Sequence, residues 1–198
     1  MALAQQGSIM TGRRRRALAD ERGFSLPEIL TIVALIGVLS GITIIAFQAA
    51  AATIQGDSNL RVVERQLKLA RDTAVSQRRS VEVQFVMPNE LRVIRRDLPA
   101  GTTLLQSAFL ENNTTFRRFA GVPDTPDSFG GADAINLGGA AVVLFTSDGM
   151  FVDGAGTPVN GTIYIGQAGN SVTQRAVTVF GSTARIRTYR WNGSQWGS

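Results

Sequence analysis

The longest uncharged stretch of the chain places the strongest constraint on its fold. It separates Glu28 from Asp57 and contains 28 residues without an ionisable side chain. Its most apolar part spans residues 29–47. At about 1.5 Å per residue, a helix of that length is roughly 28 Å long, close to the hydrocarbon thickness of a bilayer. The stretch therefore predicts a helix that lies in lipid or in a helical bundle.

Arginines precede this stretch. Residues 1–23 carry five arginines, four of them consecutive at 13–16, against Asp20 and Glu21. Because positively charged flanks of a membrane helix stay in the cytoplasm, we expect a single span with a cytoplasmic N-terminus. From Phe24 onward the chain has 15 basic and 13 acidic side chains, so most of its net charge of +5 lies before the helix. The overall charge is therefore a weak argument for nucleic-acid binding.

Two ordinary kinds of targeting segment also combine a basic N-terminus with an apolar run. One is a secretory signal peptide cut near the alanine run at 49–52, and the other is a plain signal anchor. The apolar run is longer than the core of about 7 to 15 residues found in signal peptides. Glu28 argues against both, because a carboxylate just inside an apolar segment is costly unless it has a partner. Glu28 is therefore a candidate functional residue.

The chain contains neither cysteine nor histidine. These residue types are needed for disulfides, thiol nucleophiles, Ser-His-Asp catalysis and most zinc sites. The sequence has no Walker A, G-x-S-x-G or dinucleotide motif, so we expect no enzyme activity, metal or cofactor. Asp124, Asp127 and Asp133, in a segment rich in Gly and Pro, leave calcium as an alternative, although their spacing matches no EF-hand.

After the apolar stretch the chain combines a helix with strands. Apolar residues recur at intervals of 3 and 4 from Leu60 to Ala74, which is typical of an amphipathic helix. Together the two stretches predict one long helix over about 25–77. Period-two alternation then predicts a hairpin over 81–94 and, after a long loop at 124–139, strands at 141–146, 150–152, 162–165, 175–180 and 184–191.

This order of elements predicts an α+β fold. The first half of the long helix is transmembrane, and its amphipathic second half packs on an antiparallel β-sheet body. The predicted organisation is a basic leader at 1–23, the helix at 24–78 with its transmembrane part at about 29–47, and a β-rich globular domain at 79–198.

Residues 22–30 read Arg-Gly-Phe-Ser-Leu-Pro-Glu-Ile-Leu and lead into the apolar run. This segment resembles the N-terminal signature of type IV pilins and pseudopilins. The resemblance implies that a prepilin peptidase cuts after Gly23 and methylates the new N-terminal Phe24, and that Glu28 acts in assembly. Pro27 departs from the family, which usually has an aliphatic residue there. Since proline disfavours helix at the preceding residue, we expect the precursor helix to break near Leu26 and to leave the scissile bond accessible.

The body resembles that of minor pseudopilins of the GspH and FimT type in its early hairpin, its turn at 145–149 and its last strand with an Arg-x-Arg pair. The resemblance implies a structural subunit of a type II secretion pseudopilus or a type IV pilus. It further implies a single-pass protein of the bacterial inner membrane with a periplasmic domain. The implied partners are prepilin peptidase, other pilins or pseudopilins, and an inner-membrane assembly platform.

Gly37 and Gly41 form a G-x-x-x-G pattern within the apolar run. Two such glycines allow another helix to approach closely. Glycine also loosens a helix by about 1 kcal/mol, so local melting is an alternative, and a chance occurrence is another. Close packing and local melting would each suit a filament core built from packed helices.

The last predicted strand carries Arg185, Arg187, Tyr189 and Trp191 at alternate positions. Strand geometry places all four on one face, where phosphate contacts and base stacking could bind DNA. The FimT-like branch is associated with DNA uptake through a Gly-Arg-x-Arg motif, and Ala184 replaces its glycine here. DNA binding in natural transformation is therefore the alternative function. The other interpretation of this face is a solvated edge strand whose charges discourage pairing.

Overall fold

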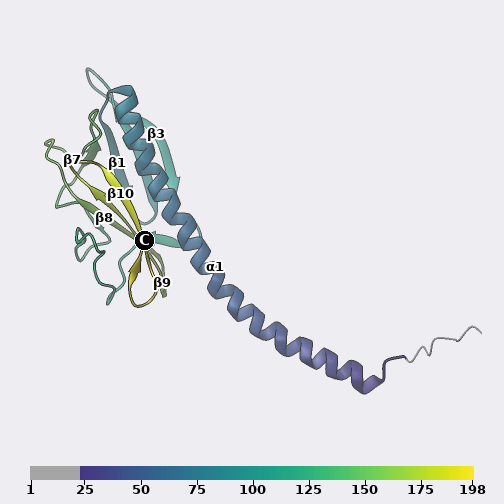
Figure 1. Cartoon of the computed structure of the whole chain (residues 1–198). Coiled ribbons are helices and arrows are strands. Elements are labelled where there is room, and N and C mark those ends of the chain that lie inside the picture. Colours follow the sequence, from purple (N-terminus) through teal and green to yellow (C-terminus); the bar gives the residue numbers. More distant parts are fainter. Residues whose placement is uncertain (1–22) are drawn as a thin grey trace, which may run out of the picture. The chain divides into compact units, whose positions relative to one another are not determined.

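The computed structural model describes residues 23–198, apart from the side chains of residues 44–46, 48 and 49 (Figure 1). Of the predicted leader, only Gly23 lies within the described residues. The chain divides into two units between Ile44 and Ile45, and helix α1 (Leu26–Gln77) contributes to both. Within the described residues α1 is followed by eleven strands, which confirms the predicted α+β class.

Helix α1 begins at Leu26 for local reasons. The Ser25 carbonyl accepts hydrogen bonds from the backbone N–H of Glu28 at 3.0 Å and of Ile29 at 3.1 Å. Pro27 lies in the first turn, where its missing N–H removes no helical hydrogen bond. The Thr31 hydroxyl donates to the Pro27 carbonyl at 2.8 Å. This bond satisfies the hydroxyl without water, as an apolar environment requires.

The first part of α1 is an unburied apolar segment. Residues 26–43 are long and apolar enough to cross a membrane, and none of them is buried within the chain. Thr43 repeats the pattern of Thr31 by donating its hydroxyl to the Leu39 carbonyl at 2.8 Å. The side chains of this segment therefore depend on lipid or on other helices for burial.

The second unit combines the rest of α1 with two antiparallel sheets. One sheet has the order β3 (Thr102–Phe109), β2 (Glu90–Arg96), β1 (Val81–Val86), β6 (Val143–Phe145) and β7 (Phe151–Asp153). The other has the order β11 (Trp196–Gly197), β10 (Arg185–Trp191), β9 (Asn170–Phe180), β8 (Gly161–Gln167) and β4 (Thr114–Phe116), with β5 (Ile135–Asn136) also paired to β8.

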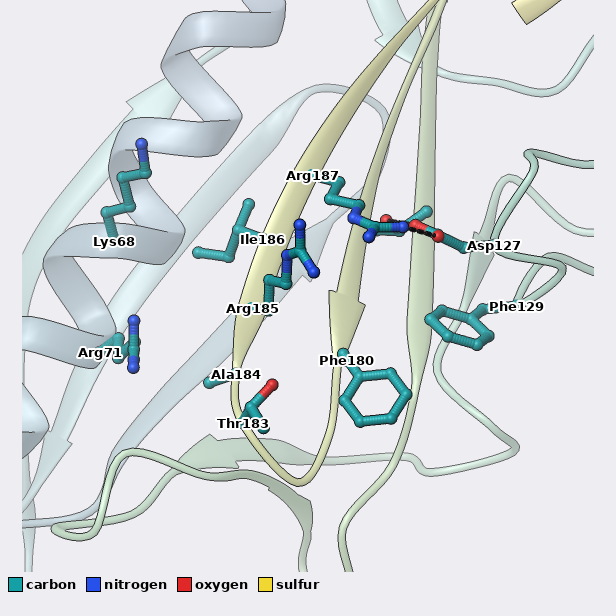
Figure 2. A pocket seen from close by; sticks show the side chains of 11 residues that line it. Lys68, Arg71, Asp127, Phe129, Phe180, Thr183, Ala184, Arg185, Ile186 and Arg187 are labelled. Carbon is teal, nitrogen blue, oxygen red and sulfur yellow. Dashed lines mark hydrogen bonds and ion pairs between the residues drawn. The ribbon is translucent and has the colours of Figure 1, made fainter. Parts of the chain in front are cut away.

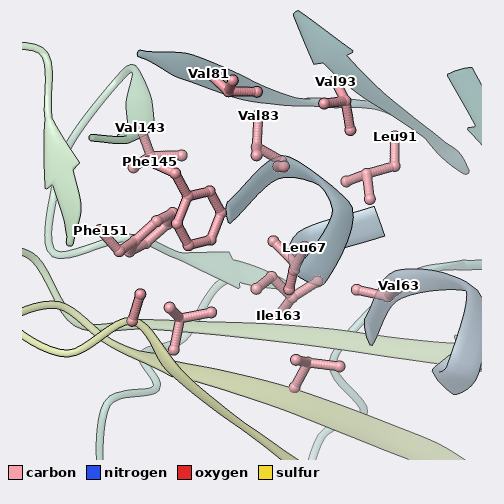
Figure 3. Packing of buried hydrophobic residues seen from close by; sticks show 14 of the residues in the cluster. Val63, Leu67, Val81, Val83, Leu91, Val93, Val143, Phe145, Phe151 and Ile163 are labelled. Atoms are coloured by element: carbon pink, nitrogen blue, oxygen red, sulfur yellow. The ribbon is translucent and has the colours of Figure 1, made fainter. Parts of the chain in front are cut away.

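One core joins the helix to both sheets. The predicted apolar face of the helix is buried, and its members are Leu60, Val63, Leu67, Ala70 and Ala74. They share a cluster with buried side chains from the two sheets, among them Val83, Leu91, Phe145, Phe151 and Ile163 (Figure 3). The period of 3 to 4 residues in the sequence therefore predicts the correct face of α1.

A buried ion pair fixes the helix to the second sheet. Arg175 of β9 is only 2% exposed and donates Nε to Asp57 Oδ1 of α1 at 2.7 Å. Its Nη1 donates to the carbonyls of Val172 and Gln174, each at 2.9 Å. The guanidinium is thus compensated by one carboxylate and by backbone oxygens.

Most predicted strands are present, with different ends. The hairpin of β1 and β2 is confirmed, with Val86 opposite Glu90 at its turn. The sequence pattern did not predict β3, β4 or β11. The segment predicted as a long loop is irregular except for the two residues of β5. Strand β3 escaped prediction because it has no fully buried residue and therefore no clear alternation. Strands β4 and β11 are only three and two residues long, too short to show a period of two.

Candidate functional site

The residues implied in processing lie directly before α1. Gly23, Phe24 and Ser25 have no regular secondary structure, and the Phe24 side chain is 72% exposed. Glu28 is exposed in the first turn of the helix. A carboxylate at that position is favoured by the partial positive charge of the helix N-terminus. The arrangement leaves the Gly23–Phe24 peptide bond outside the helix and the Glu28 carboxylate open to another molecule.

Gly37 and Gly41 have no packing partner within the described chain. A Cβ placed on either glycine would meet nothing within 4 Å. The large apolar side chains around them are exposed as well, including Ile36, Val38 and Leu39. Close helix packing at this pattern therefore needs a second molecule, and it stays a prediction.

The four residues of β10 that were predicted to form a DNA-binding face are not all accessible to solvent. Arg185 and Arg187 are exposed, but Tyr189 is only 5% exposed and Trp191 only 8%. The expectation of two aromatic rings available for base stacking is therefore wrong. Ala184 is buried and Ile186 half-buried on the opposite face, toward the core, as the alternation predicted.

The two aromatic rings are buried because distant segments cover them. Trp196 of β11 packs on Trp191, with ring centroids 5.4 Å apart, and belongs with Tyr189 to a small apolar cluster. Its Nε1 donates to the Pro123 carbonyl at 3.0 Å, which ties the C-terminal segment to the loop at 123–130. Period-two alternation identifies which residues share a face of the strand, but a loop about 60 residues away decides whether that face meets solvent.

Asp127 holds the same loop on β9 and β10. Its Oδ1 accepts a hydrogen bond from Arg187 Nη1 at 2.5 Å, and its Oδ2 accepts one from the Thr178 hydroxyl at 2.6 Å. Partial burial raises the pKa of Asp127, but the bonds from Thr178, Tyr189 and Arg187 outweigh it and hold the pKa below its usual range. Hydrogen bonding to Tyr189 and to Asp127 raises the pKa of Arg187. Arg187 is exposed but already has a carboxylate partner within its own chain.

The carboxylates considered for calcium have structural partners or lie apart. Asp124 accepts hydrogen bonds from the Tyr164 hydroxyl at 2.5 Å and from the Gly130 N–H at 2.9 Å. Burial, followed by the bond to Asp124, raises the pKa of Tyr164 above its usual range. Asp133 is exposed. Within residues 23–198 no three acidic side chains are grouped so that they could hold a metal ion.

A groove of about 780 Å³ opens beside the start of β10 (Figure 2). Lys68 and Arg71 of α1 lie on one side of the groove, and Arg185 and Ile186 of β10 also line it. The remaining lining residues are Asp127, Phe129, Thr178, Phe180, Thr183, Ala184 and Arg187. Lys68 and Arg71 were not predicted as site residues. Their spacing of three places them on one helix face, but only the fold brings that face to β10.

Comparisons with known proteins give distant matches. No family model matches the sequence, and no curated protein does either. The type IV minor pilin FimU of Pseudomonas aeruginosa (strain PAO1) is similar with a TM-score of 0.45 and 19% identity, over 67% of this chain and 90% of that one. The minor pseudopilin EpsH of the type 2 secretion system of Vibrio cholerae has a TM-score of 0.44 and 15% identity, over 70% and 96%. At this distance the chain's own residues carry the functional argument.

Proposed function

We propose that the chain is a pilin-like structural subunit that is cut between Gly23 and Phe24 and assembled through the first half of α1 into a pseudopilus or pilus. The observation that carries the proposal is a helix segment, residues 26–43, that is apolar on all sides and unburied in its own chain. Glu28 is the only ionisable side chain in that segment. Such a helix can exchange lipid for neighbouring helices of the same kind without exposure to water.

The chemistry of the N-terminus supports this proposal. Cleavage before Phe24 creates an α-amine four residues before Glu28, and methylation keeps that amine charged. A carboxylate that enters an apolar helix bundle needs a cation, and the amine of an adjacent subunit supplies one. The ion pair would set the axial position of each new subunit.

The groups present on β10 fit this structural role better than they fit DNA binding. Tyr189 and Trp191 are buried, and Arg187 is paired with Asp127. Nucleic-acid sites normally combine several free cations with exposed rings. The proposed function therefore involves no enzyme activity, and its partners are the processing peptidase, an assembly platform in the inner membrane and other subunits of the filament.

Recovery of the chain in filaments tests the proposal. The tagged full chain is expressed with a prepilin peptidase and a complete set of pilus or pseudopilus components, and filaments are separated from membranes by shearing and sedimentation. We expect the chain in the filament fraction only when the peptidase is active. Retention of all the chain in the membrane fraction, or the same distribution with an inactive peptidase, would contradict the proposal.

A further inference from the structure

Strand β10 has an unpaired edge. Its other edge pairs with β9 from Arg185 to Arg190, whereas β11 covers only Arg190 and Trp191. No strand of the described chain pairs with residues 185–189 on this side. Backbone N–H and C=O groups at such an edge can add another strand.

The unpaired edge lies in a channel formed by two adjoining grooves. The groove of about 780 Å³ and a second one of about 570 Å³ both include Arg185, Ile186 and Arg187 in their lining. Glu64, Lys68 and Arg71 of α1 lie along the channel in steps of three to four residues, which is one face of the helix. The channel therefore follows the edge strand and has space for an extended chain.

The lining of the first groove leaves two cations without a counter-ion. Lys68 Nζ lies 2.6 Å from Glu64 Oε1, and Arg187 is paired with Asp127. Within residues 23–198, Arg71 and Arg185 form no ion pair. Both belong to the lining of the first groove, one from the helix and one from the strand (Figure 2). An occupant with carboxylates would neutralise both.

We propose that the edge of β10 at residues 185–189 binds an extended segment of a partner polypeptide with acidic side chains, which adds to the second sheet as a strand. The backbone of the partner pairs with β10, and its carboxylates pair with Arg185 and Arg71. Small apolar side chains of the partner pack on the apolar part of the lining, which includes Phe129, Phe180 and Ile186.

The lining favours a peptide over a nucleic acid. Two unpaired guanidinium groups supply few phosphate contacts, and two carboxylates, Glu64 and Asp127, also line the channel. The unpaired strand edge offers main-chain groups that a peptide matches and a sugar-phosphate backbone does not. The proposal concerns only the unit that begins at Ile45 and holds whether or not the apolar helix segment enters a filament.

Peptide binding to the full chain in detergent micelles tests the proposal. The probe is a fluorescein-labelled peptide of seven residues that alternates valine with glutamate, and binding is followed by fluorescence anisotropy. We expect the matched peptide with glutamine for glutamate to bind about tenfold more weakly, the effect of losing one to two charge-assisted hydrogen bonds. Methylation of the peptide nitrogens that face the strand should abolish binding.

Variants of the chain localise the site. Arg185→Gln and Arg71→Gln should each weaken binding of the acidic peptide about tenfold. Arg117→Gln is the matched control, because Arg117 is also exposed but follows β4 at the opposite edge of the same sheet, and it should leave binding unchanged. Hydrogen exchange should show slower exchange of amides within residues 185–189 when the acidic peptide is bound.

Four results would overturn the proposal. Equal affinity for the glutamate and glutamine peptides would remove the charge match, and an equal loss in the Arg117→Gln protein would show attraction to charge in general. Exchange within 185–189 unchanged by peptide would rule out strand addition. Tighter binding of a single-stranded oligothymidine that is lost in Arg185→Gln would assign the groove to nucleic acid instead.

Discussion

Replacing Glu28 by leucine is expected to remove the chain from filaments while its β-rich domain stays folded. Glu28 lies on the unburied first turn of α1, in the unit that ends at Ile44, so the substitution touches no core residue of the domain. In a filament its carboxylate would be the partner of a neighbour's Phe24 amine. Leucine leaves that amine uncompensated among apolar helices, which is costly enough to block incorporation. The measurement is the fraction of chain recovered in sheared filaments, where we expect a decrease of at least about tenfold, the equivalent of about 1.4 kcal/mol.

Thr31→Leu is the matched control for this variant. Thr31 lies one turn along the same helix, and its hydroxyl is already satisfied by the Pro27 carbonyl, so it should not need a neighbour. The Thr31→Leu protein should therefore enter filaments as the unmodified chain does. Incorporation of Glu28→Leu at the same level as Thr31→Leu would show that Glu28 has no intersubunit role, or that it pairs with the amine of its own chain one turn away.

Replacing Asp57 by alanine is expected to cost the domain about 3 kcal/mol of unfolding free energy, the lower end of the range for breaking a buried ion pair. Arg175 is almost fully buried and would keep its carbonyl partners but lose its carboxylate. The lower end applies because the Asp57 side chain is 26% exposed. Arg190 Nε, at 3.2 Å from the same Asp57 oxygen, also loses its partner, although that side chain is mostly solvated. Urea unfolding of the full chain in micelles, followed by the fluorescence of Trp191 and Trp196, measures the change.

Two further variants separate this ion pair from other causes. Arg175→Met removes the buried charge and leaves Asp57 with Arg190, so it should cost less than Asp57→Ala. Glu64→Ala breaks the exposed pair with Lys68 on the same helix and should change stability by less than about 0.5 kcal/mol. If Asp57→Ala and Glu64→Ala had equal effects, the buried pair would not be what fixes the helix to β9.

The sequence predicted elements whose pattern is local. The apolar run, the face from Leu60 to Ala74 and the first hairpin each follow from spacing within one segment, and all three are present. Strand β3 was missed because an edge strand with no fully buried residue lacks a clear alternation. The α+β class could be predicted for the same reason: it depends on the order of such segments and not on their long-range contacts.

The surroundings of the last strand depend on contacts that no local pattern contains. Alternation placed Tyr189 on the correct face, but the loop at 123–130 and Trp196 bury it. Likewise, Arg71 joins Arg185 only through the packing of α1 beside β10. Asp57 and Arg175 are 118 positions apart, and neither was predicted to have a partner. These groups share the property that their function or stability depends on a residue from another part of the chain.

The mass of the chain extracted from membranes tests the central claim most directly. Expressed with an active prepilin peptidase, the protein should have the mass of residues 24–198 plus one methyl group, and fragmentation should place the methyl on the amine of Phe24. With an inactive peptidase the mass should be that of the full chain. A chain that begins near Ala50 or Ala52, or that retains residues 1–23 in the presence of the active enzyme, would contradict processing at Gly23 and the assembly role built on it.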